Sequence, residues 1–396
     1  MAVDKNNPSF AGRVHGMLHG VALGDAMGAP VEKLSAAEIR ARYGRVETLD
    51  TAWHRDSQSV SMRKGRRRGN GIVTDDTFMT LALMEVYNVT SRHLDAWDMA
   101  DGMVREIAWR ERWIPELQRE CPLIERLFYP EKWIFQRHQL SSCDPRQGGI
   151  GNMVNCGAAM YIAPIGAVNA ANPQRAYDEA INFASGHQQS YGLEAAGVLA
   201  GAVAAAFQPN MTIGKVVGVA HGLAKDGTRT AISLVAEVAE NLRDKGAEFD
   251  EVVAVFQLEI AKFSTMGNDL NHTVERAGVA SAGYQPSRFQ SIEELPLALG
   301  FSIVAQGDFR KSILDGINSG RDTDSIGVMA GAILGAMHGD TVIEPRDAML
   351  LDTANRLEIA SETDRFIATA QKIMTNDAAE AETIRRHRAS LLNKDT

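Results

Sequence analysis

Two short acidic motifs stand far apart in the chain, each just before an apolar run that predicts a helix. The first is Thr74-Asp75-Asp76-Thr77, and the second is Arg321-Asp322-Thr323-Asp324-Ser325. Thr and Asp are common helix N-cap residues, so capping alone is one interpretation of each motif. Two carboxylates at one helix start exceed what capping needs, and they repel each other unless a cation binds. Oxygen ligands of this kind suit Mg²⁺, Mn²⁺ or Ca²⁺.

The two motifs have the same design, which predicts that they meet at one shared site. Asp322 and Asp324 are two residues apart, so both carboxylates can face one side of the chain as it enters the helix. The Ser325 hydroxyl can add a neutral oxygen. The pooled ligands are carboxylates and hydroxyls in a number that suits two six-coordinate cations, each keeping several waters.

A third element, GDAMGAPVE at residues 24–32, ends a predicted helix and turns into a loop. Gly28 and Pro30 form a plausible helix stop, and Glu32 follows on the loop. A loop carboxylate beside Lys33 is easily left in water, so a surface position is the alternative to a role in the site.

The elements that must position these residues read as helices. Strand signals are scarce, since no run of alternating β-branched residues recurs, and the sequence therefore predicts an all-α protein. Faces of small residues, such as Gly327, Ala330, Gly331 and Gly335, predict helices that approach closely at the centre of a compact bundle. The expected helices are 14–27, 77–89, 176–184, 193–207, 230–243, 249–261, 295–304, 309–317, 326–337 and 347–374.

Irregular structure is expected in three segments, 51–71, 141–155 and 283–296, which are rich in glycine, proline or charge. The first holds a strongly basic stretch, Arg63-Lys64-Gly65-Arg66-Arg67-Arg68. A solvated charge run is one interpretation of this stretch, and a clamp for a phosphate or an acidic partner is the other.

The composition is that of a folded globular protein, with 45% apolar and 23% charged residues. A net charge of −9 argues against a dedicated nucleic-acid binder, which needs surplus Lys and Arg. The apolar runs are too short to span a bilayer, no secretory signal is visible at the start, and three cysteines lack zinc or disulfide spacing. We expect a cytoplasmic protein that does not insert in a membrane.

The order of these motifs resembles the ADP-ribosylglycohydrolase family. The matching stretches are GDAMGAPVE, TDDT and GRDTDSIGVMAGAILGAMHG, the last at 320–339, together with GAAMYIAPIG at 157–166, Gly186-His187, and GDFRKSILDGINSG at 307–320. The likeness runs from about residue 10 to about residue 372. The family includes enzymes that remove ADP-ribose from dinitrogenase reductase and from modified arginine or serine.

The resemblance implies a single compact orthogonal helical bundle with a central two-metal cleft over residues 10–372. Outside this domain we expect a disordered or extended N-terminus at 1–9 and a charged helical tail at 373–396. Two Mg²⁺ or Mn²⁺ ions are implied. The implied metal ligands are Thr74, Asp75, Asp76, Asp322, Asp324 and Ser325.

The implied activity is hydrolysis of an N- or O-glycosidic ADP-ribosyl linkage by a water that two metals activate, with Glu32 or Asp76 accepting its proton. Asn155, Cys156, Gly157 and His187 are the implied substrate-binding residues. The partner is an ADP-ribosylated protein or a small ribosyl substrate.

Two departures from the family pattern bear on the substrate. Cys156 stands where many relatives carry Asn, and Tyr161 stands where they carry Arg. A free nucleoside-like substrate is therefore an alternative. A catalytically silent structural protein on the same fold is a further one, although such a protein has no need to keep the acidic ligands.

Overall fold

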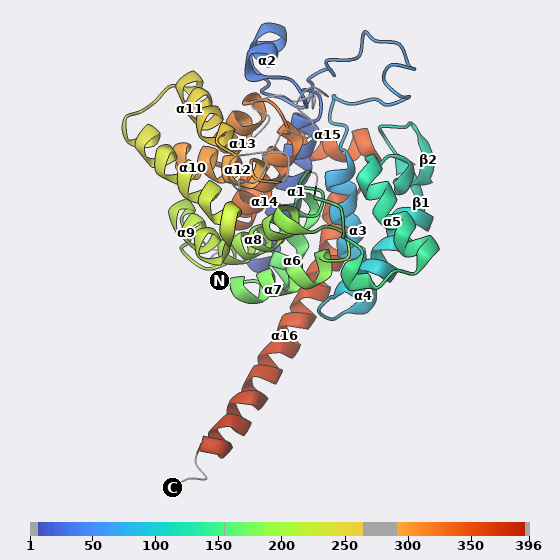
Figure 1. Ribbon diagram of the computed structural model, residues 1–396, viewed down its shortest axis with the longest axis vertical. Coiled ribbons are helices and arrows are strands. Elements are labelled where there is room, and N and C mark those ends of the chain that lie inside the picture. Colours follow the sequence, from blue (N-terminus) through green and yellow to red (C-terminus); the bar gives the residue numbers. More distant parts are fainter. Residues whose placement is uncertain (1–6, 154, 264–290, 393–396) are drawn as a thin grey trace.

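The computed structural model describes residues 7–153, 155–263 and 291–392, and these form a bundle of helices with one small hairpin (Figure 1). The hairpin joins β1 (Glu111–Ile114) to β2 (Arg119–Pro122), antiparallel, with Arg112 opposite Cys121. The helices are α1 (Phe10–Gly28), α2 (Ala36–Tyr43), α3 (Asp75–Thr90), α4 (Ala96–Asp98), α5 (Tyr129–Ser141), α6 (Ala163–Val168), α7 (Pro173–Ala184), α8 (Ser190–Ala206), α9 (Ile213–Leu223), α10 (Asp226–Asp244), α11 (Phe249–Ala261), α12 (Glu294–Val304), α13 (Phe309–Asn318), α14 (Thr323–His338), α15 (Pro345–Asn355) and α16 (Ile359–Leu392).

Helices α1 and α14 pack along each other at the centre of the bundle. Glycines of α1 face glycines of α14 in three successive pairs, at 16 and 335, 20 and 331, and 24 and 327. A Cβ atom on Gly327 would lie 2.8 Å from the carbonyl oxygen of Gly24, closer than packed atoms allow. The small-residue face predicted for 326–337 is therefore confirmed as a close helix contact, and it brings the C-terminal end of α1 beside the N-terminal end of α14.

The central pair is surrounded by the other helices. Helices α8, α12 and α13 pack against α14, while α3 and α16 pack against α1. Arg13 on α1 is buried and donates from Nη1 to the carbonyl oxygens of Ala206, Ala336 and Met337, at 2.8–2.9 Å. One guanidinium thus satisfies C-terminal carbonyls of both α8 and α14, which lack partners within their own helices.

The all-α prediction is confirmed, but two boundaries were wrong. The single helix expected at 347–374 is broken between α15 and α16, because Arg356 adopts a left-handed conformation with φ of 54°. The Asp352 carboxylate then accepts from the Ile359 N–H at 2.9 Å, which helps to start α16. Pro296, expected in a loop, lies in the first turn of α12, whereas residues 283–290 lie outside the described residues.

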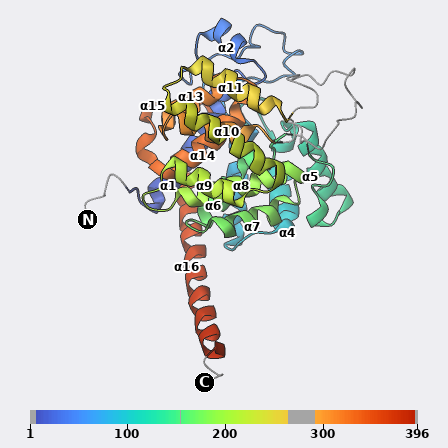
Figure 2. The ribbon, with the colours of Figure 1, turned by 60° about the vertical axis from the view of Figure 1, so that its left-hand side comes forward.

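Helix α16 projects from the body of the molecule, as both views show (Figures 1 and 2). It passes the expected boundary between residues 372 and 373 without interruption, and no residue after Ile373 is buried as far as Leu392. The division into a domain and a tail stays a prediction. None of the described helices is long and apolar enough to cross a membrane.

Candidate active site

The two acidic motifs meet where the ends of three helices converge. Asp76 lies in the first turn of α3, Asp324 in the first turn of α14, and Asp25 near the end of α1. All three are buried, and one carboxylate oxygen of each lies within 4.8 Å of the others. The glycine contact between α1 and α14 makes this possible, since it lets two backbones carrying carboxylates come together.

Asp25 organises the start of α3. Its Oδ2 accepts hydrogen bonds from the Thr74 N–H at 2.8 Å, the Thr77 N–H at 3.1 Å and the Thr77 hydroxyl at 2.5 Å. Thr74 is the N-cap residue and its own side chain makes no capping bond, so Asp25 caps the helix from outside. The other oxygen, Oδ1, is buried without a partner among the described residues.

Asp76 is held between two hydroxyls. The Thr74 hydroxyl donates to its Oδ2 at 3.2 Å, and the Ser325 hydroxyl donates to its Oδ1 at 3.3 Å. Burial raises the pKa of Asp76 well above its ordinary value, and the charges of Asp324 and Asp25 raise it further. Burial likewise raises the pKa of Asp25 to about 7, with the charge of Asp324 contributing. A divalent cation would remove this repulsion and bind the free Asp25 oxygen, so these residues fit a hard metal ion.

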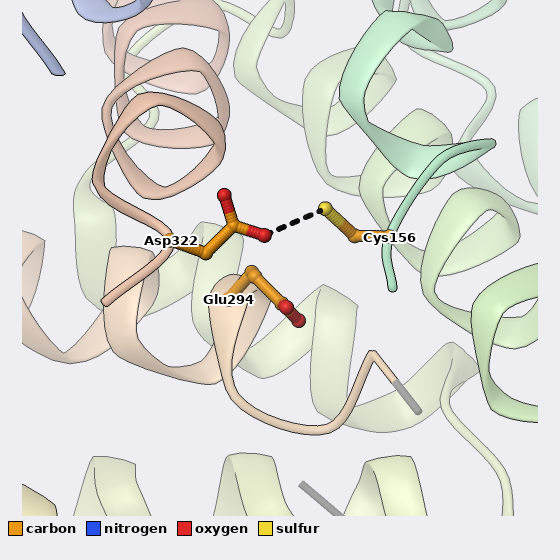
Figure 3. Close-up of side chains that lie close together, drawn as sticks. All are labelled: Cys156, Glu294 and Asp322. Carbon is orange, nitrogen blue, oxygen red and sulfur yellow. Dashed lines mark hydrogen bonds between the residues drawn. The ribbon is translucent and has the colours of Figure 1, made fainter. Parts of the chain in front are cut away.

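A second group of ligand atoms lies beside the first. Asp322 precedes α14, Glu294 begins α12, and Cys156 lies in the loop before α6, and their ligand atoms lie within 4.8 Å of one another. The Cys156 thiol donates to Asp322 Oδ2 at 3.8 Å, with Glu294 beside them (Figure 3). Burial raises the pKa of Asp322 to about 7, and the charges of Glu294 and Glu32 add to it.

Both groups contribute to the lining of one cavity of about 280 Å³, although Asp25 itself is buried and does not line it. It receives the side chains of Asp75, Asp76, Asp322, Asp324, Ser325, Glu32, Asn155 and Cys156. Three other predicted site residues, Thr74, Gly157 and His187, do not line it. Thr74 supports Asp76 from behind. The cavity thus gathers most of the residues that the sequence placed in the site, and their roles stay predictions.

A chain of buried ion pairs forms one wall of the cavity. Arg126 contacts both Asp75 and Glu116, and Arg68 contacts Glu116 at 2.8 Å and Glu32 at its far end. Burial alone would raise the pKa of Glu32, but the charge of Arg68 outweighs it and holds this pKa below its ordinary value. Glu32 is therefore ionised at neutral pH, whereas the pKa values of Asp25 and Asp76 are raised.

The predicted substrate loop is built around Glu131 of α5. The Asn155 amide donates to Glu131 Oε1 at 3.2 Å and accepts from the Gly157 N–H at 3.1 Å. A Cβ atom on Gly157 would lie 2.5 Å from Glu131 Oε1, so any larger residue there would have to displace the Glu131 carboxylate. Glu131 lines the cavity, and burial raises its pKa to about 7.

His187 does not line the cavity, although the family resemblance implies that it binds the substrate. Its ring stacks on Tyr161 with centroids 5.5 Å apart, and its Nδ1 hydrogen-bonds the Tyr161 hydroxyl at 2.7 Å. Burial lowers the pKa of His187 to about 3, so the ring is neutral. Tyr161, the second departure from the family pattern, thus orients His187 and does not reach the cavity.

A comparison with known protein families shows to which family the chain belongs. The model of the ADP-ribosylglycohydrolase family matches residues 6–377. The chain belongs to the ADP-ribosylglycohydrolase family. Membership supports a glycohydrolase on this fold, and the acidic clusters could bind the metal on which this family depends.

The similarity of this ADP-ribosylglycohydrolase family member to its relatives extends over most of its length. It is 24% identical over 350 residues to the uncharacterized protein YegU of Escherichia coli (strain K12), covering 87% of this chain and 93% of that protein. It is 26% identical over 319 residues to an uncharacterized protein of Archaeoglobus fulgidus, covering 80% and 85%. A solved ADP-ribosylglycohydrolase-related protein complex matches the fold with a TM-score of 0.54 and 21% identity, over 91% of this chain and 99% of that chain.

Several cavity residues of this family member escaped the sequence reasoning. Asp25, which lies beside the cavity, carried a signal, since it is a carboxylate in the otherwise apolar end of α1 at residues 20–28, within the quoted GDAMGAPVE stretch. Glu131 and Glu294 carried no such signal in the sequence. Each stands in a segment of ordinary polarity, and only tertiary packing brings it to the cavity. Arg126, the partner of Asp75, was missed for the same reason. Arg68 belongs to the basic stretch that the sequence analysis singled out, but its ion pair with Glu32 was not predicted.

Proposed function

We propose that this protein hydrolyses an ADP-ribosyl linkage, N- or O-glycosidic, with the help of two Mg²⁺ or Mn²⁺ ions. The observation that carries the proposal is the cluster of Asp25, Asp76 and Asp324, three buried carboxylates within 4.8 Å. Family membership supports it independently. Each site would combine ligands from different helices, with Asp25, Asp76 and Asp324 at one ion and Asp322 with Glu294 near the other.

Divalent cations in these places would lower the pKa of a bound water and hold the vicinal hydroxyls of the ribose. The side chains of the protein do the rest. Glu32 is ionised and faces the cavity, so it is available to accept a proton from the attacking water, although the charge of Arg68 that lowers its pKa also makes it a weak base. Thr74 and Ser325 fix the orientation of Asp76. The ionised carboxylates also stabilise the positive charge that develops on the anomeric carbon in the transition state.

A second candidate is a free nucleoside-like substrate with the same ribosyl chemistry. The observation that favours it is Cys156, whose thiol lines the cavity where many relatives carry an amide. A thiol is a weak hydrogen-bond donor, so this part of the wall recognises polar groups less strictly.

The test is a panel of ADP-ribosyl-arginine, ADP-ribosyl-serine and free nucleosides, each assayed with Mg²⁺, with Mn²⁺ and with a chelator. We expect turnover of an ADP-ribosyl substrate that stops on chelation. Asp324→Asn should lower kcat by about 100-fold or more, since it removes a charged ligand without changing shape. The matched control is Asp244→Asn on the exposed end of α10, which should retain activity. Turnover of nucleosides alone favours the second candidate, and no turnover of any substrate contradicts both.

A further inference from the structure

A second cavity adjoins the acidic one. Its volume is about 330 Å³, and it shares wall residues with the first, among them Glu32, Arg68 and Phe128. One wall is the irregular basic segment between residues 53 and 68, and the other is the start of α5 with the residues before it, 127–132. The ion pair between Arg68 and Glu32 stands at the boundary between the two cavities.

The charge of this side pocket is opposite to that of the acidic cavity. Among the described residues that line it, Glu32 is the single acidic side chain, and it is already engaged by Arg68 and by Lys33 at 3.4 Å. Beyond Arg68, the cationic residues of the lining are Lys33, Arg55, Arg63, Lys64, Arg66 and Lys132.

Most of this positive charge is not neutralised. Arg55, Lys64, Arg66 and Lys132 have no carboxylate within 4.0 Å among the residues that the structure describes, and Arg63 has only Asp56 at 3.8 Å. Lys132 donates instead to the backbone carbonyl of Glu125. Burial lowers the pKa of Lys132, and the charge of Arg66 lowers it further. Cations from two walls therefore repel one another across the pocket, and a bound anion would relieve that repulsion.

The lining also offers aromatic surface. Trp53 and His54 come from the basic segment, and the rings of Phe128 and Tyr129 lie with centroids 4.5 Å apart at the start of α5. Tyr129 is 69% exposed. Guanidinium groups bind phosphate oxygens through paired hydrogen bonds, and aromatic faces cover the ring or sugar attached to the phosphate.

We propose that this side pocket binds a phosphate group of the substrate whose ribosyl bond lies in the acidic cavity. The inference rests on the proposed function and deepens it, because it names the part of the protein that binds a phosphate of the substrate. In this arrangement the ribose and the cations bind in the acidic cavity, and the negatively charged phosphate group binds in the side pocket. The phosphate is either the diphosphate of the ADP-ribosyl group or a phosphate on the leaving group.

The first test measures binding without turnover, so it stands whether or not an ADP-ribosyl substrate is cleaved. Pyrophosphate is titrated calorimetrically into the metal-free full chain, because bound metals would also attract it. We expect binding that weakens with salt. Arg55→Gln/Lys132→Gln, which removes one cation from each wall, should raise Kd by about tenfold or more.

The matched control is Lys372→Gln/Arg388→Gln, which removes the same charge from the exposed part of α16 and should leave Kd unchanged. Circular dichroism checks that both variants fold. Absence of pyrophosphate binding in the wild type, or equal affinity in the two double variants, would overturn the proposal. So would binding of an acidic peptide without binding of pyrophosphate, since the pocket would then serve a protein partner.

The second test separates the two sources of the phosphate through kinetics with Mg²⁺. If the diphosphate of the ADP-ribosyl group binds there, the Arg55→Gln/Lys132→Gln variant raises KM for every ADP-ribosyl substrate and leaves KM for a phosphate-free nucleoside unchanged. If the leaving group carries the phosphate, KM rises only for substrates with a phosphorylated leaving group. An equal rise for phosphate-free substrates would contradict the proposal, because the pocket would then act on the fold or on the metals.

Discussion

At the scale of single residues, five carboxylates in or beside the cavity fall into two kinds. Asp75 and Glu32 each contact a buried arginine, Arg126 and Arg68, so their charges are matched within the protein. Asp25, Asp76 and Asp324 form no ion pair with a cation among the residues that the structure describes, and burial raises the pKa of each. Since a buried charge without a partner is unstable, these three sites require either protons or metal ions. The site thus contains carboxylates that arginines already neutralise and carboxylates that could be neutralised by bound cations.

Cys156 allows a direct test of substrate recognition at this scale. Replacing the thiol by an amide, in Cys156→Asn, supplies a strong donor and acceptor next to Asp322. We expect the ratio of kcat/KM for an ADP-ribosyl substrate over a simple ribosyl substrate to rise about tenfold, which corresponds to about 1.4 kcal/mol. The control is Cys143→Ser, whose sulfur contacts His138 and does not line the cavity. An unchanged ratio would show that Cys156 does not set specificity.

At the scale of elements, the site depends on how closely α1 and α14 approach. Their facing glycines carry Asp25 on one helix to within reach of Asp324 on the other. Helix α3 then joins them, since its N–H groups bind Asp25. The Asp25 carboxylate thus joins the end of α1 to the start of α3, while the glycine contact holds α14 beside α1. A change in the spacing of α1 and α14 should therefore change the proposed metal site.

Gly331→Ala tests this coupling. The added methyl group would collide with the backbone of Gly20, and backbone atoms cannot move aside as a flexible side chain can. We expect a loss of about 2 kcal/mol or more in the free energy of unfolding, measured in urea, together with weaker metal binding. Gly218→Ala on α9 is the matched control, because its Cβ would meet open space. That variant should gain about 0.5–1 kcal/mol and bind metal normally. Equal behaviour of the two variants would contradict the close-packing account.

At the scale of the whole molecule, buried acids make stability depend on pH and metal together. Burial raises the pKa of Asp25, Asp322 and Glu131 to about 7. Acids whose pKa is raised by folding stabilise the folded state fully at low pH, and that contribution is lost as pH rises through about 7. Glu32 and Glu116 have lowered pKa values and act in the opposite sense, at pH below about 4. Above pH 5 the acidic groups with lowered pKa values no longer contribute, but buried histidines with lowered pKa values, such as His187 and His138, make stability rise with pH. The part of the pH dependence that responds to metal therefore reports the acids with raised pKa values.

We expect the metal-free protein to lose a few kcal/mol of stability, in order of magnitude about 2–4, between pH 5 and pH 8. Millimolar Mg²⁺ or Mn²⁺ should restore it at pH 8 and do little at pH 5, because the metal competes with protons for the same carboxylates. Asp25→Asn, which keeps an acceptor for Thr74 and Thr77, should reduce the metal effect. Melting temperatures with and without metal provide the measurement, and a Tm at pH 8 that metal does not change would rule out the metal centre.

The amino-acid sequence by itself determined the helical class, the family and the two acidic motifs. These are local properties: apolar residues at helical spacing, N-cap residues before them, and glycines at a period that marks one face of a helix. Asp76 and Asp324 could be placed at one site because both stand at helix starts of the same design. The break at Arg356 was missed, since a non-glycine residue in a left-handed conformation leaves little trace in the residue pattern.

Only the tertiary structure decided which charges are compensated. Glu32 and Asp75 acquire arginine partners from segments 36 and 51 residues away, and no local pattern links those positions. It also placed Glu131 and Glu294 at the cavity, put Asp25 beside Asp76 and Asp324, and paired His187 with Tyr161 outside the cavity lining. The physical reason is that a pKa depends on burial and on every charge nearby in space, whereas the sequence specifies only which groups are close along the chain.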